Sequence, residues 1–134
     1  MRAPGTVRDH FSVDMVYDNI RKELSGIDDA KKLVRMLAYA LGRRGVARLT
    51  NTSDPSTVSR WITGGATPHS QTLQRIREGY CVYETMRRYF GSDTAAEQWL
   101  TGASARFDYG MPLDALANDR LRDVIAAMKA DIIH

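Results

Sequence analysis

Apolar residues recur every three or four positions in one segment after another, and glycine, proline or a capping side chain separates these segments. Val16, Ile20 and Leu24 follow this spacing and predict a helix over about residues 12–24 that ends near Gly26. No long apolar–polar alternation and no Asn-Gly or Asp-Gly hairpin indicates a β-strand. The pattern therefore predicts an all-α chain, a helical bundle with short connections.

The same spacing predicts further helices along the rest of the chain. In order, they cover residues 28–41, 43–52, 55–63, 71–90, 92–102, 112–118 and 119–132. Side-chain oxygens that could accept from the first free amides of these helices come from Asp28 or Asp29, Ser53 or Asp54, Ser92 or Asp93, and Asp119. The stretch "ASARFDYGM", residues 103–111, predicts a loop.

The length of 134 residues fits one domain, or one small domain with an appendage. A single cysteine, Cys81, excludes an internal disulfide framework and suits a reducing compartment. The first residues lack the apolar run of a signal peptide, and the longest apolar run, "MLAYAL", is too short to cross a bilayer. We therefore expect a cytoplasmic protein with no membrane partner.

Charge is distributed unevenly along the chain. Residues 27–90 carry eleven basic and five acidic side chains, a net charge of +6, whereas residues 91–134 carry four basic and seven acidic ones, a net charge of −3. Such segments could simply be solvated faces. Together with the helix described next, the basic middle indicates a surface for a polyanion.

The stretch "SDPSTVSRWITGG", residues 53–65, predicts a short helix with Pro55 in its first turn and two glycines at its end. Val58, Trp61 and Ile62 can anchor one face of this helix. Its other face carries hydroxyls and one arginine. With the helix before it, separated by the tight turn "TNTSD", it forms the pattern of a helix-turn-helix, whose second helix enters the DNA major groove.

The predicted DNA contacts follow from this arrangement. Short hydroxyl side chains permit close approach, Arg60 can reach a guanine, and three arginines beside the preceding helix can meet phosphates. The candidate DNA-binding residues are Arg43, Arg44, Arg48, Ser53, Ser56, Thr57, Ser59, Arg60 and Thr63. The alternative is a capped structural helix in an all-α bundle.

Signals for catalysis are weak. His10, His69 and His134 are scattered, and neither a His-x-x-x-His nor a Cys-x-x-Cys spacing exists for a metal. Cys81 is better explained as a buried structural thiol than as a nucleophile. The aromatic stripe of the long helix, which includes Tyr80, is typical of a core or a dimer interface. We expect no enzyme activity, no metal and no cofactor.

The stretch "STVSRWITGGATPHSQTLQRIRE" resembles the Xre family of helix-turn-helix regulators, with a Thr-Val-Ser-Arg-Trp core followed by Gly and a Pro/Ser-rich link. The turn is one residue longer than the usual spacing, and Asn51 or Thr52 stands where Gly is common. The tail, "AAEQWLTGASARFDYGMPLDALANDRLRDVIAAM", resembles the toxin-binding domain of the Xre/MbcA/ParS antitoxins. It has the Trp-Leu, the loop glycine, the Pro-x-x-Leu region and the Arg-x-x-Val register of that family, but "FDYG" in place of "LGG".

This resemblance implies an antitoxin that binds and neutralises a RES-domain, NAD-degrading toxin and represses its own operon as a homodimer on double-stranded DNA. It divides the chain into residues 1–90, for DNA binding and dimerisation, and a small helical toxin-binding domain, residues 91–134. The candidate toxin contacts are Arg106, Phe107, Tyr109, Asp114, Asp119, Arg120, Asp131, Ile132 and His134. Phe107 and Tyr109 could instead fold back into the core. The alternative function is a stand-alone transcriptional repressor, such as a phage-type immunity regulator, whose tail dimerises.

Overall fold

The structure, a computed structural model, describes the backbone of residues 6–133 and the side chains of residues 13–132. That part of the chain is all-α, as predicted, with no β-strand beyond one isolated bridge between Ser104 and Gly110. The helices are α1 (Thr6–Ser25), α2 (Ala30–Leu49), α3 (Pro55–Thr63), α4 (Ser70–Phe90), α5 (Asp93–Thr101), the 3-10 turn η1 (Ala105–Phe107), α6 (Pro112–Ala117) and α7 (Leu121–Ile133).

Capping side chains set the beginnings of three helices where the sequence predicts them. The carboxylates of Asp29 and Asp54 and the hydroxyl of Ser92 accept hydrogen bonds from backbone amides in the first turns of α2, α3 and α5. The predicted cap at Asp119 is wrong. This residue precedes the first residue of α7 by two positions, adopts a left-handed φ of 61°, and turns its carboxylate toward Arg75.

A glycine breaks α2 in its second half. The sequence predicts two helices over residues 28–52, and the structure places them in one element with a kink at Gly42, where φ is 75° and ψ is 167°. Only glycine adopts this backbone region without substantial strain. Gly42 therefore separates the first segment of α2 from residues 43–49, which lead toward α3.

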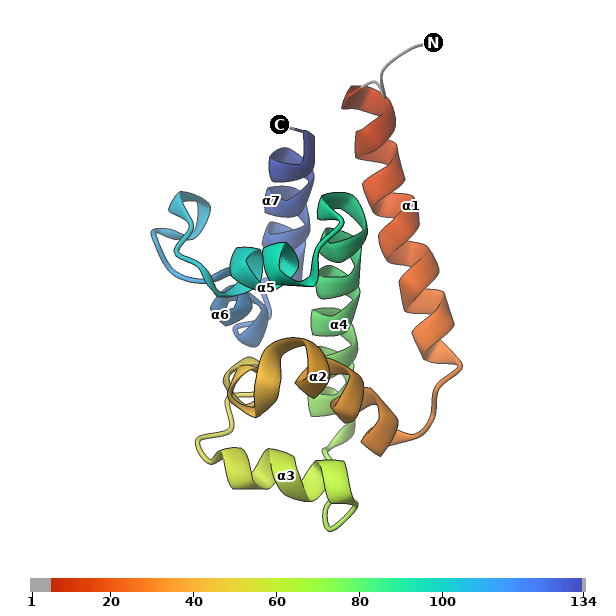
Figure 1. Cartoon of the computed structure of the whole chain (residues 1–134), viewed down its shortest axis with the longest axis vertical. Helices are drawn as coiled ribbons and strands as arrows, with labels where there is room; N and C mark the ends of the chain where they lie inside the picture. The colour runs from red at the N-terminus through yellow and green to blue at the C-terminus, as the bar shows by residue number, and fades with distance from the viewer. Residues whose placement is uncertain (1–5, 134) are drawn as a thin grey trace.

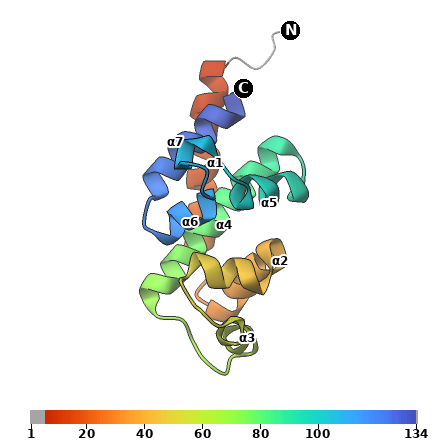
Figure 2. The same ribbon diagram turned by 90° about the vertical axis from the view of Figure 1, so that its left-hand side faces the viewer.

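The long helix α4 is the centre of the molecule (Figures 1 and 2), and α1, α2, α5, α6 and α7 all pack against it. Residues 81–86 are all buried. Of the predicted stripe, Ile76, Tyr83 and Met86 are buried, but Phe90 at the end of the helix is 41% exposed. At Gly79 an added Cβ would lie 2.5 Å from Leu49 Cδ2, so the absence of a side chain lets the end of α2 approach α4 closely.

The hydrophobic core is continuous across the predicted boundary near residue 91. It runs from Val13 on α1 to Met128 on α7 and includes Leu100, Leu113 and Leu116 from the tail. The helices of residues 91–133 therefore share their core with α1, α2 and α4. Among the described residues, no helix combines the length and the apolar character needed to cross a membrane.

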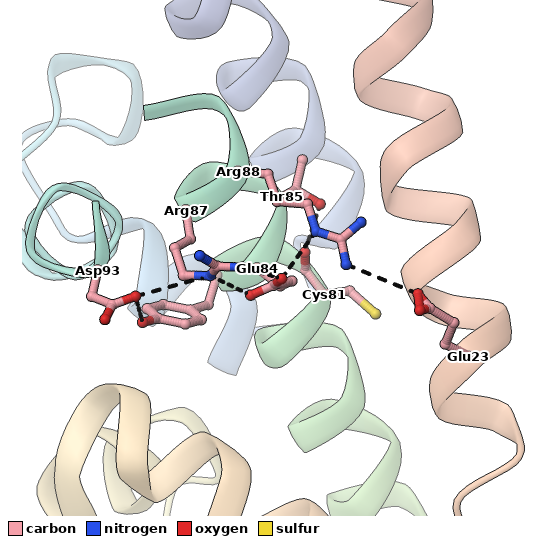
Figure 3. A network of polar contacts seen from close by, with 8 residues as sticks. Glu23, Cys81, Glu84, Thr85, Arg87, Arg88 and Asp93 are labelled. Atoms are coloured by element: carbon pink, nitrogen blue, oxygen red, sulfur yellow. Dashed lines mark hydrogen bonds and ion pairs between the residues drawn. The ribbon is translucent and has the colours of Figure 1, made fainter. Parts of the chain in front are cut away.

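A buried carboxylate on α4 organises a polar network between α1 and α5 (Figure 3). Glu84 is 8% exposed and accepts two hydrogen bonds from Arg87, both 2.7 Å long, and one of 2.9 Å from Arg88. Arg88 lies 4.0 Å from Glu23 on α1, and Arg87 lies 3.9 Å from Asp93 at the start of α5. The two guanidinium groups compensate a charge that would otherwise be costly to bury.

This network predicts an acid-sensitive contribution to stability. Hydrogen bonding from Arg87 holds the pKa of the Glu84 carboxyl below its ordinary value of 4.5. A depressed pKa stabilises the folded state above pH 4.5, and this contribution is lost as the pH falls through the folded-state pKa. We expect Glu84→Gln to lower the free energy of unfolding at pH 7 by about 1.5–3 kcal/mol, the range for hydrogen bonds to charged groups.

Chemical denaturation from pH 7 to about pH 3 measures both effects. The gap between the parent protein and Glu84→Gln should narrow as the pH falls, whereas Glu97→Gln, an exposed glutamate of α5, should match the parent protein throughout. An equal gap at both ends of this range would contradict the assignment.

Candidate nucleic-acid and partner interfaces

Residues 43–63 form two helices joined by a short turn, here called the helix pair. It comprises the part of α2 after Gly42, the turn of residues 50–54, and α3. Val58 and Trp61 of α3 are buried against a core that includes Ala47 and Leu49 of α2, and Ile62 is half-buried. The shared core predicted for these two helices is confirmed.

The turn of the helix pair depends on Asn51. This residue has a left-handed φ of 55°, and its side-chain Nδ2 donates a 2.9 Å hydrogen bond to the carbonyl oxygen of Ala117 at the end of α6. Asparagine tolerates the left-handed region better than most residues. Asn51 thus adopts the left-handed backbone conformation for which glycine is commonly used. This explains why the turn needs no glycine.

The outer face of α3 carries the predicted polar residues. Ser56, Arg60 and Thr63 are exposed, and Thr57 and Ser59 are half-buried, so all five remain at the surface. Arg60 Nη2 lies 3.4 Å from the Thr57 hydroxyl. Ser53, just before α3, is also exposed.

A hollow lies between the start of α3 and the residues that follow Gly42. Its lining includes Arg43, Arg44, Ser56 and Ser59, and Arg43 Nη1 donates a 2.8 Å hydrogen bond to the Ser59 hydroxyl. The first amide of α3, that of Ser56, already donates to the carboxylate of Asp54, so the side chains supply the donors of this hollow. An anion such as a phosphate group would meet two arginines and two hydroxyls in one place.

Arg48 does not lie with these residues. Its guanidinium binds Asp114 of α6 through two hydrogen bonds, 2.6 Å from Nε to Oδ1 and 3.0 Å from Nη2 to Oδ2. The sequence predicts Arg48 as a phosphate contact and Asp114 as a toxin contact, and in the structure the two side chains bind each other while remaining partly exposed.

The predicted partner residues of the tail also divide into two groups. Phe107 is 8% exposed, so the prediction of an exposed aromatic is wrong there, and its ring packs beneath the guanidinium of Arg120 at 5.4 Å. Tyr109 is 73% exposed, and Arg106 and Arg120 are exposed. Arg106 and Arg120 are ion-paired at 2.9 Å with Asp131 and Asp123 respectively, so Tyr109 is the most accessible of the three side chains beside the η1 turn.

The carboxylates of the tail have partners within the chain. Asp131 accepts a 2.9 Å hydrogen bond from Arg106 Nε and a 2.8 Å hydrogen bond from Trp99 Nε1. Asp119 is ion-paired with Arg75 of α4. Ile132 is half-buried against the core, and His134 lies outside the described residues. Asp131 and Ile132 therefore contribute mainly to the fold.

A further contact of the helix pair has no clear signal in the sequence. Arg35 of α2 donates a 3.2 Å hydrogen bond from Nε to the carbonyl oxygen of Ile62, in the last turn of α3. A cation at a helix C-terminus is favourable for the helix dipole. The sequence gives no sign of this contact beyond the excess of basic residues in the segment 27–90.

The predicted burial of Cys81 is confirmed. The side chain is 2% exposed, and burial raises the pKa of its thiol to about 12. The thiol is therefore protonated at neutral pH and unsuited to nucleophilic attack. Within the described part of the chain, no group of three or more His, Cys, Asp or Glu side chains could hold a metal ion.

Comparisons with protein-family models, with curated proteins and with solved structures find no match for this chain.

The role of Asn51 predicts an order of stabilities among its variants. Asn51→Gly keeps the left-handed backbone but loses the hydrogen bond to Ala117, which should cost about 0.5–1.5 kcal/mol. Asn51→Ala loses the same bond and also places a Cβ in the left-handed region, which should cost about 1–2 kcal/mol more. Thermal or chemical denaturation should rank the parent protein first, Gly second and Ala third. A reversed order of Gly and Ala would contradict the role of the backbone conformation.

Proposed function

We propose that the protein binds double-stranded DNA at its own promoter through the helix pair, and that it acts there as a repressor. One observation carries this proposal. Arg43, Arg44 and the hydroxyls of Ser56 and Ser59 lie together at the surface around one hollow. Such a surface suits a polyanion, and the packing of α3 on α2 leaves its polar face outward.

In this proposal α3 enters the major groove, and its exposed side chains meet the edges of the bases. Arg60 reads a guanine through a bidentate contact, and the hydroxyls of Ser56 and Ser59 approach bases or the backbone closely. Arg43 and Arg44 contact phosphates beside the groove. Phosphate contacts supply affinity for any sequence, whereas base contacts supply specificity.

These roles predict different binding signatures. Arg60→Ala should weaken binding to the specific promoter by about 1–3 kcal/mol and leave binding to random DNA nearly unchanged. The double variant Arg43→Ala, Arg44→Ala should weaken binding to both. It should reduce the slope of log affinity against log salt by up to about 2, because two phosphate contacts no longer release counterions. Titrations at several salt concentrations measure these quantities.

A matched control removes the same charge from another face. The double variant Arg21→Ala, Arg122→Ala takes two exposed arginines from α1 and α7. Its salt slope should stay close to that of the parent protein. If it reduced the slope as much as the Arg43 and Arg44 variant, net charge alone would explain the effect and the helix pair would lose its assignment.

We further propose that the protein is an antitoxin in the cytoplasm that neutralises a RES-domain, NAD-degrading toxin through residues 91–134, with no cofactor of its own. The resemblance of the tail to the Xre/MbcA/ParS antitoxins is the basis of this part. The exposed side chains for such a contact are Tyr109, Arg106 and Arg120, of which the two arginines already bind Asp131 and Asp123 within the chain. Exposed aromatic and arginine side chains are common at binding hot spots.

A stand-alone repressor is the second candidate, and a specific observation favours it. The predicted toxin contacts Asp114, Asp119 and Asp131 are paired within the chain, and the tail shares the core of the rest of the protein. A tail of this kind could serve the fold alone. The two candidates differ in whether the exposed residues around η1 contact another protein.

Tyr109→Ala tests the antitoxin proposal directly. Removal of an exposed aromatic should leave the fold intact but weaken neutralisation of the RES-domain toxin of the same operon by about tenfold or more, if Tyr109 is a hot spot. Growth rescue and co-purification on co-expression measure this effect, with Asn19→Ala, an exposed residue of α1, as the control. Full rescue by Tyr109→Ala, Arg106→Ala and Arg120→Ala alike would contradict this contact surface, and failure of the parent protein itself to rescue growth or to co-purify would favour the stand-alone repressor.

Removing residues 91–134 is a less suitable test. Leu100, Leu113, Leu116 and Met128 are at most 1% exposed and pack in the same core as α4. A chain cut after Gly91 would therefore lose toxin binding through loss of the fold as readily as through loss of a contact.

A further inference from the structure

A groove of about 580 Å³ lies between α2, α4 and the start of α5, here called the α2–α5 groove. Met36, Ala40 and Tyr80 form an apolar part of its lining and are only partly buried. Tyr39 stands on its rim and is 91% exposed. The groove thus combines a small apolar part and an exposed tyrosine with six charged lining residues, a composition typical of an interaction site with a polar rim.

The charged residues of the groove differ between its two walls. The α2 wall carries Asp29, Lys32 and Arg35, a net charge of +1, and Lys32 forms no ion pair among the described residues. The wall of α4 and α5 carries Glu84, Arg87 and Asp93, a net charge of −1. On the opposite wall, the side chain of Asp93 is 69% exposed, and its nearest cation, Arg87, lies 3.9 Å away and is already bound to Glu84. The groove thus offers an unpaired cation on one wall and an incompletely paired anion on the other.

The wall formed by α4 and α5 has a fixed shape. Arg87 is held by Glu84, and the hydroxyl of Tyr83 donates a 3.1 Å hydrogen bond to Asp93, so the side chains of this wall are connected before any partner arrives (Figure 3). Binding then orders few additional groups, which favours affinity.

We propose that the α2–α5 groove is the interface between two copies of this chain, with Tyr39 of each copy inserted into the groove of the other. A surface that carries both a protruding aromatic and a receptive apolar groove can pair with itself about a two-fold axis. The charges of the two walls are also complementary across this axis, because Lys32 on the α2 wall of one copy can face Asp93 on the opposite wall of its partner. A small ligand in the groove would leave the ring of Tyr39 in water, and a second copy covers it.

The position of the groove suits the proposed operator binding. Figures 1 and 2 place α3 at one end of the long axis of the molecule, with α2 and then α5 further along that axis. The groove is lined by no residue of α3 and is separated from α3 by α2, so a partner in the groove leaves α3 uncovered. A two-fold axis parallel to the long axis places both α3 helices at the same end of the dimer, as two half-sites of one operator require. This use of the dimer rests on the proposed function, but the dimer itself can be tested without DNA.

Sedimentation equilibrium of the purified full chain tests the interface. We expect a concentration-dependent dimer, and Tyr39→Asp should raise its dissociation constant by about tenfold or more, because a charge replaces a central aromatic. Tyr109→Asp is the matched control, since it places the same charge at another exposed tyrosine, and it should leave the dissociation constant unchanged. Circular dichroism should be the same for all three proteins.

A cysteine variant gives an independent measurement. The single native cysteine is buried, so Tyr39→Cys creates one accessible thiol. At a protein concentration that favours the dimer, a thiol reagent should modify Tyr39→Cys more slowly than at high dilution, whereas it should modify Tyr109→Cys equally fast at both concentrations. An equal rate for Tyr39→Cys at both concentrations, a protein that is monomeric at every concentration, or a dimer insensitive to Tyr39→Asp would each overturn the proposed interface.

The outcome remains separate from that of the proposed function. A dimer that depends on Tyr39 but does not bind the promoter would support this interface and contradict operator binding. Promoter binding by a protein that is monomeric at all concentrations would do the reverse. An intact dimer in Tyr39→Asp that fails to co-purify with the toxin would assign the groove to that partner and overturn the proposal.

Discussion

The burial of α4 on almost every side is the constraint on which the rest of the structure depends. Six consecutive residues, 81–86, are buried, and six consecutive positions of an α-helix point in all directions around its axis. Such a helix needs a neighbour on each face. α1, α2, α5, α6 and α7 supply these neighbours, so the order in which they follow along the chain matters less than their common contact with α4.

One of these six residues is charged, and this shapes the periphery of α4. Glu84 can be buried because two arginines of the next turn bind it. The same arginines extend to α1 and α5, so compensation of one buried charge also links the two helices that flank this part of α4. Burial of the apolar side chains of α4 and compensation of the Glu84 charge therefore both hold α5, the first helix of the tail, against α4.

The sequence predicts the elements of this fold better than their contacts. Asp29, Asp54 and Ser92 accept hydrogen bonds from amides only two or three residues later in the chain. The local sequence is therefore sufficient to predict the starts of α2, α3 and α5. Burial of Val58 and Trp61 follows from helical spacing alone. The break at Gly42 also depends on local sequence. The sequence predicts a boundary between two helices there, but not that they form one kinked element.

The sequence does not predict the contacts that each polar or aromatic side chain makes within the fold. Arg48 and Asp114 are separated by 66 positions, and nothing in the local pattern of either residue indicates the other. Phe107 lies in a segment with loop composition, yet the η1 turn directs its ring inward, where Arg120 covers it. The charged residues of a predicted site are therefore the least predictable part, because each can satisfy its charge within the protein as well as with a partner.

The magnitudes of the contacts between the helix pair and α6 indicate what fixes the position of α3. The Arg48–Asp114 pair has side chains that are 57% and 35% exposed, and exposed ion pairs contribute about 0–1 kcal/mol. Val46 and Leu49 of α2 and Leu113 and Leu116 of α6 are at most 1% exposed, and burial of such a side chain contributes about 1.5–3 kcal/mol. Apolar packing therefore sets the framework on which α3 rests, and the ion pair adds little to it. The polar face of α3 is held by a core that is complete within one chain, so its geometry is formed before any partner binds.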